Sequence, residues 1–196
     1  MAENPTWEEK LASYGRLACL FQPYQGCTTP YATLLYLHTP ETASVVALIR
    51  DLLRSHADLD RDSVVLLQER DWRPLIVVAT AAVLGLRTSL VVAGMWCAFD
   101  WCNWLSPQLA AALSIADPAF LESALNRLRR SPYGRSANSA SALLELCRAD
   151  HPDDPRVVET GRDGEIQRLI EKDTDSGGLI ALQWRTRLLE IIQTLP

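Results

Sequence analysis

Apolar residues recur along most of this chain at the spacing of an α-helix. One such stripe runs through residues 39–56 and consists of Val45, Leu48, Ile49 and Leu52. Positions i, i+3, i+4 and i+7 lie on one face of a helix, so this stripe would face a protein core. Thr39 and Pro40 stand before it as N-cap and first-turn proline, which are helix-start signals. The pattern therefore predicts an amphipathic helix over 39–56.

Similar patterns, often opened by a capping residue or a proline, predict further helices. We expect them at 60–70, 71–85, 88–104, 106–116, 117–130, 136–150 and 176–195. We find no persuasive alternation of apolar and polar residues with a period of two, which would predict a β-strand. Residues 62–67 and 75–79 are nevertheless rich in the β-branched residues that favour strands. Residues 22–40 read as loops around a short helix, and 150–165 as a polar connection before the C-terminal helices. The sequence thus predicts an all-α protein with a single domain over 1–196.

Two stretches near the centre of the chain resemble each other. Trp72 and Trp104 are 32 positions apart, and each is followed within three positions by a proline and then by an Ala-rich apolar run. Stacked helical pairs produce repeats of 20 to 50 residues, because one pair cannot bury its apolar face alone. Over residues 40–130 the pattern resembles the HEAT-like and armadillo-like α-solenoids. That resemblance implies an α-α superhelix of short antiparallel helix pairs, and a scaffold that binds other macromolecules.

Composition limits the class of protein further. The chain has 196 residues, of which 48% are hydrophobic and 22% charged, as in an ordinary globular protein. The apolar stretches 75–86 and 90–99 are shorter than the roughly 20 residues that span a bilayer, so we expect no membrane insertion. Five scattered cysteines and no secretory signal predict a cytoplasmic protein. No cofactor or metal site is expected, because no ligand set has the required spacing.

Charge is distributed unevenly along the chain. Between Asp150 and Asp175 there are nine acids and four bases, which accounts for the whole formal charge of −5. Just before this stretch lies a basic cluster of Arg127, Arg129, Arg130 and Arg135. Complementary charge steers protein association, whereas an acidic chain is poorly suited to nucleic acid. We therefore expect a protein partner, and candidate contact residues are Arg127, Arg129, Arg130, Arg135, Asp153, Asp154 and Asp163.

The aromatic segment 95–104 adds a second candidate surface. Most of its rings are expected in the core, but Trp101 or Trp104 could line an exposed groove, and tryptophan is common at binding hot spots. Together these features predict a non-catalytic, all-helical scaffold that binds another protein. One specific version is a small bacterial immunity protein whose acidic stretch neutralises a basic toxin.

Two alternatives stay open at this stage. An enzyme could assemble a dispersed active site in a cleft between helices from residues such as His38, Asp100 and Arg73. A small-molecule binder could instead use the tryptophan cluster as its pocket.

Overall fold

The computed structural model describes the chain except for residues 1–5, 57, 70, 103 and 131–135. Within these described residues the regular structure is helical, and one isolated bridge pairs Tyr24 with Cys27. This confirms the all-α prediction. In chain order the helices are α1 (Trp7–Ser13), the 3-10 helix η1 (Gly15–Phe21), α2 (Pro30–Tyr36), α3 (Thr42–Ser55), α4 (Leu59–Gln68), α5 (Trp72–Val83), α6 (Ser89–Trp101), α7 (Ser106–Ala116), α8 (Phe120–Arg129), α9 (Ala137–Asp150), α10 (Pro155–Arg162), α11 (Gly164–Ile170) and α12 (Gly177–Thr194).

Several predicted boundaries differ from the observed helices by a few residues, and two of the differences affect the description below. Helix α3 begins at Thr42 and not at 39, because the Thr42 N–H donates to the Thr39 carbonyl in a preceding turn, at 3.1 Å. The helix predicted over 88–104 ends at Trp101, so that Trp104 lies in the turn before α7.

The polar connection predicted at 150–165 is wrong, because half of it is helix α10 and its last two residues begin α11. The carboxylate of Asp154 caps this helix by accepting the N–H of Arg156 at 2.8 Å, and Pro155 occupies the first turn. Val157, Thr160 and Gly161 form its buried face. Only three of its eight positions are buried, and three of the other five are charged, so the pattern is typical of a solvated linker.

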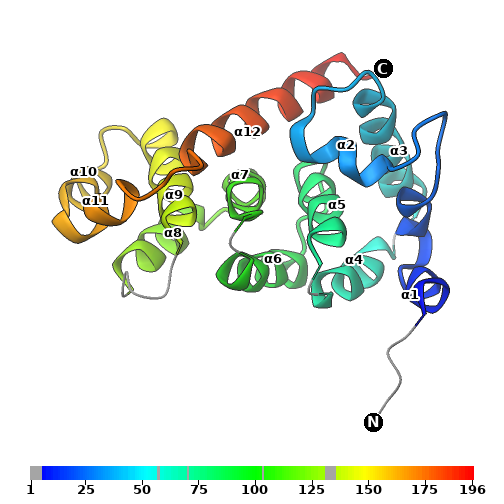
Figure 1. The fold of residues 1–196 in the computed structure, drawn as a ribbon, viewed down its shortest axis with the longest axis horizontal. Helices are drawn as coiled ribbons and strands as arrows, with labels where there is room; N and C mark the ends of the chain where they lie inside the picture. The colour runs from blue at the N-terminus through cyan, green and yellow to red at the C-terminus, as the bar shows by residue number, and fades with distance from the viewer. Residues whose placement is uncertain (1–5, 57, 70, 103, 131–135) are drawn as a thin grey trace, which may run out of the picture.

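Consecutive helices pack as pairs: α4 with α5, α6 with α7, and α8 with α9. The second members α5, α7 and α9 lie side by side, with α4, α6 and α8 along one side of the row. Helix α12 runs along the opposite side, over α9 and α7, and reaches α3 (Figure 1). None of the helices in the described ranges has the length and apolarity to cross a membrane.

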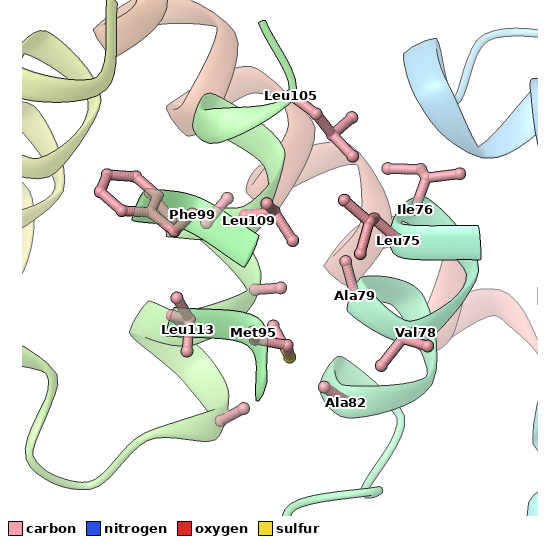
Figure 2. Packing of buried hydrophobic residues seen from close by; sticks show 14 of the residues in the cluster. Leu75, Ile76, Val78, Ala79, Ala82, Met95, Phe99, Leu105, Leu109 and Leu113 are labelled. Carbon is pink, nitrogen blue, oxygen red and sulfur yellow. The ribbon is translucent and has the colours of Figure 1, made fainter. Parts of the chain in front are cut away.

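This layering explains why the middle helices are apolar nearly all round. Every residue of α5 from Pro74 to Val83 is buried, and α7 is buried from Ser106 to Leu113. Figure 2 shows Leu75 of α5 facing Leu109 of α7, and both side chains are fully inaccessible to solvent. A helix covered on two sides needs no polar face, so the apolar stretch 75–86 is a central core helix. The stretch 90–99 lies instead in α6, along one side of the row, and its Leu90 and Cys97 are exposed.

Side chains of α7 and α12 donate hydrogen bonds to backbone carbonyls at the C-terminal end of α2. The Trp184 indole N–H donates to the Leu34 carbonyl at 2.8 Å, and the Arg187 guanidinium donates to the Tyr36 carbonyl at 3.1 Å. Between them, the Gln108 amide donates to the Leu35 carbonyl at 3.4 Å. The last carbonyls of a helix have no partner within it, so two of these bonds tie α2 to the last helix and the third ties it to α7.

Candidate functional site

The turns of two successive helix pairs, α4–α5 and α6–α7, meet at one end of the row and enclose an open hollow of about 620 Å³. We call it the tryptophan groove. Its lining comprises Lys10, Glu69, Asp71, Trp72, Arg73, Trp101, Cys102 and Trp104.

The three groove tryptophans lie at the start of α5, at the end of α6 and in the turn before α7. Trp72 is the first residue of α5, whose start is fixed by the Asp71 carboxylate accepting the Arg73 N–H at 3.1 Å. Trp101 is the last residue of α6, and Trp104 lies in the turn before α7. Trp72 is half-buried, whereas the side chains of Trp101 and Trp104 are 38% and 50% exposed. The groove therefore presents two large rings to solvent beside a third that is anchored.

A series of ring contacts fixes the anchored side. The Trp72 ring meets Trp104 edge-on at 5.2 Å between centroids, and it meets Tyr31 edge-on at 5.7 Å. Tyr31 stacks on Phe21 at 5.5 Å, and Phe21 contacts the buried Tyr14 at 4.9 Å. Offset and edge-to-face pairs are the favourable arrangements of aromatic rings. The groove wall is thus continuous with the core and held in one geometry.

The charged groups of the groove are paired with one another. Arg73 contacts Asp71 at 2.8 Å, and Lys10 contacts Glu69 at 3.4 Å. The Arg73 guanidinium also lies 5.3 Å from the centre of the Trp72 ring, within cation–π range. Burial raises the pKa of the nearby Tyr14 hydroxyl to about 12, and the charges of Glu69 and Asp71 add to this. Among the described lining residues, the charges of the groove therefore balance.

The basic cluster predicted at the end of α8 is only partly free to bind. Arg127 holds both carboxylate oxygens of Asp100, at 3.0 and 3.1 Å, and its guanidinium lies 4.0 Å from the centre of the Trp96 ring. It joins α8 to α6 and is a structural residue. Arg129 and Arg130 are exposed, and Arg135 lies outside the described residues.

The acidic candidates separate into two roles. Asp153 and Asp163 line a second open hollow, of about 650 Å³, together with Pro155, Val158, Glu159 and Arg162. Asp154 is instead held by the Arg156 guanidinium at 2.8 Å. That hydrogen bond, with the one from the Arg156 backbone, lowers the pKa of the Asp154 carboxyl to about 2. Asp154 therefore stabilises α10. Asp163 caps the next helix in the same way, because its carboxylate accepts the N–H groups of Glu165 and Ile166 at 2.8 and 3.2 Å.

The residues considered for a dispersed active site have separate surroundings. Asp100 is bound to Arg127, Arg73 to Asp71, and the exposed His38 lies against Tyr36. Across the described part of the chain, no three potential metal ligands of the His, Cys, Asp and Glu types cluster together.

Sequence reasoning found part of the tryptophan groove and missed the rest. Trp101 and Trp104 were candidates, and the structure brings them together with Trp72, whose 32-residue spacing from Trp104 was the available signal. Lys10 and Glu69 were missed, because they are 59 positions apart and meet only when α1 packs near the end of α4.

No family model matches this chain, and neither a curated protein nor a solved structure matches it.

Proposed function

We propose that this protein is a non-catalytic helical scaffold that binds another protein through the tryptophan groove. The observation that carries the proposal is the pair of exposed rings, Trp101 and Trp104, which line one groove with the anchored Trp72 and of which Trp104 contacts Trp72. Burying a rigid aromatic side chain costs little conformational entropy, and tryptophans are strongly enriched among binding hot spots. A soluble fold gains nothing in stability from leaving two such rings in water, so a binding role accounts for their position.

The arrangement of pairs supports a finer proposal for the architecture. We propose that α4–α5, α6–α7 and α8–α9 are units of an α-α superhelix similar to HEAT-like arrays, with Trp72 and Trp104 at corresponding turns. In such an array, turns of successive units line up along one edge and form an extended recognition surface. We also propose a reducing, cytoplasmic setting, which is supported by five free cysteines.

A second surface supports an alternative way of binding a protein. The hollow beside α10 combines Asp153, Glu159 and Asp163 with Val158, whose side chain is 36% exposed. An acidic rim around an apolar residue suits a basic partner, as in the immunity-protein version of the hypothesis.

Affinity capture with matched variants tests the proposal and separates the two surfaces. We would compare the wild-type protein with W101A/W104A, with D153K/E159K, and with L179A as control, since Leu179 is 55% exposed on α12. We expect a partner that is recovered with the wild type, L179A and D153K/E159K but lost with W101A/W104A. Loss with D153K/E159K alone would favour the acidic hollow, and undiminished recovery with every variant would overturn both.

A further inference from the structure

We propose that helix α1 is a movable wall of the tryptophan groove, which closes on the bound partner and adds Trp7 to the contact. This inference rests on the proposed function, because it concerns how the same groove holds its partner. It is supported by the way in which α1 is attached to the rest of the molecule.

The apolar face of α1 is progressively uncovered toward the first turn of the helix. Trp7, Leu11 and Tyr14 are spaced i, i+4 and i+7, so they share one helical face. Tyr14, directly after α1, is 2% exposed, Leu11 is partly buried against the core, and Trp7 is 50% exposed. None of the seven residues of α1, all of which the structure describes, is buried. The helix is therefore held mainly at its C-terminal end.

A glycine joins α1 to an element that is fixed. Gly15 follows Tyr14 and has a φ of +56°, in the left-handed region that glycine adopts without steric cost. The next helix, η1, is anchored, since Leu17 is buried and the Arg16 N–H donates to the Asp62 carboxylate of α4 at 2.9 Å. Hinges are a few residues at the ends of elements, where the backbone absorbs a change in φ and ψ. The Tyr14–Gly15 junction therefore allows α1 to tilt while η1 stays in place.

Lys10 places α1 at the edge of the groove. Its ammonium group contacts the Glu69 carboxylate at 3.4 Å, and both residues line the groove. The two side chains are 36% and 25% exposed, and water screens such an ion pair, so this contact holds α1 only weakly. The Trp72 side of the groove differs, because its ring is fixed by contacts with Tyr31 and Trp104. The groove thus has one rigid wall and one wall that is a short, lightly held helix.

Closing carries Trp7 toward the groove. Trp7 precedes Lys10 by three positions, so the two side chains are neighbours on the helix surface, and Lys10 already lines the groove. Because Trp7 is farther from the hinge, it moves farther than Lys10 when α1 tilts. Half of the Trp7 surface is exposed to water in the free protein, and burying it against a partner favours the closed position. Trp7 then joins Trp101 and Trp104 in the contact.

Hydrogen–deuterium exchange on the full chain tests the movement. The probe is the protein that the wild type captures and W101A/W104A does not. In the free protein we expect peptides that cover residues 7–13 to exchange faster than those of α4, since local opening requires little buried contact to be broken. In the complex, exchange over residues 7–13 should become slower.

Dissociation rates of the same complex test the contact made by Trp7. We expect W7A to dissociate at least about tenfold faster than the wild type, as when a hot spot is removed, and W7F to recover most of the loss. The matched control is E8Q, at the neighbouring exposed position of α1, which should dissociate at the wild-type rate. Because α1 has no buried residue, all three variants should keep the wild-type unfolding midpoint.

Three results would overturn the inference. They are exchange over residues 7–13 as slow as in α4 in the free protein, no slowing of that exchange in the complex, and dissociation of W7A at the wild-type rate. If capture still depended on Trp101 and Trp104 in those cases, the proposed function would stand and only the movable wall would be rejected. If no protein is captured through these two tryptophans, the proposed function fails and this inference fails with it.

Discussion

The rings of Trp72 and Trp104 meet at an interplanar angle of 67°, although 32 positions separate them in the chain. Each lies at the turn that leads into the second helix of its pair, α5 or α7. Because α5 and α7 pack side by side, the turns that precede these two helices are neighbours, and the two rings lie together there. The Trp72–Trp104 contact thus follows from the packing of the helix pairs, accounts for the spacing in the sequence, and forms part of the groove wall.

The tryptophans of the groove should differ in their contribution to stability. Trp72→Ala removes the contacts with Tyr31 and Trp104, and we expect it to lower the free energy of unfolding by about 2–3 kcal/mol, less than a fully buried aromatic. Trp101→Ala should change it by less than about 0.5 kcal/mol, as for a surface site. Urea denaturation measures both free energies of unfolding. A larger loss of stability with Trp101→Ala would show that this ring stabilises the fold, and would contradict its assignment as a binding residue.

Two glycines form a matched pair at helix starts. A Cβ on Gly177 would collide with the Asn138 backbone carbonyl where α12 packs on α9, whereas one on Gly164 at the start of α11 meets nothing within 4 Å. We expect Gly177→Ala to destabilise the protein by about 1–3 kcal/mol, the cost typical of overpacking. Gly164→Ala should be neutral or slightly stabilising. Thermal unfolding of the two variants checks this, and equal midpoints would contradict the close packing of α12 on α9.

The Asp154–Arg156 pair should make stability depend on pH in the acid range. The folded-state pKa of Asp154 is about 2, below the value of about 3.9 for an unfolded chain, so the pair stabilises the fold above about pH 4. This contribution should disappear as the pH falls from about 4 through about 2. Asp154→Asn keeps a good N-cap and loses the charge, so its deficit relative to wild type should shrink over the same interval. Asp154→Ala should lose the cap as well and be less stable than Asp154→Asn at neutral pH; a deficit independent of pH would contradict the ion pair.

Cysteine reactivity should report on the core. Burial is the main cause that raises the pKa of the Cys147 thiol to about 12, whereas Cys97 is exposed on α6. Since the thiolate is the reactive form, iodoacetamide at pH 8 should modify Cys97 first and leave Cys147 intact until the protein unfolds. Mass spectrometry of the labelled peptides measures the order in which the cysteines are modified. Early labelling of Cys147 would contradict the burial of α9 in the core.

The sequence was informative where helices carry their own signals. The Asp71–Trp72 start of α5 and the Ala-rich run after it were readable, because caps and apolar composition are local properties. Helix α10 was missed, since its buried face is small and includes Thr160 and Gly161. The pairing of Arg127 with Asp100 was missed as well, because it depends on α8 lying against α6. Contacts between distant segments decide which charged residues are free, and periodicity does not contain that information.

The most direct test of the account is hydrogen–deuterium exchange on the complex with the captured partner. The tryptophan groove predicts that binding slows exchange in peptides that cover residues 69–73 and 101–105, with little change across α10 and α11. Protection confined to Asp153–Asp163, with the two tryptophan turns exchanging as fast as in the free protein, would contradict the groove as the binding site.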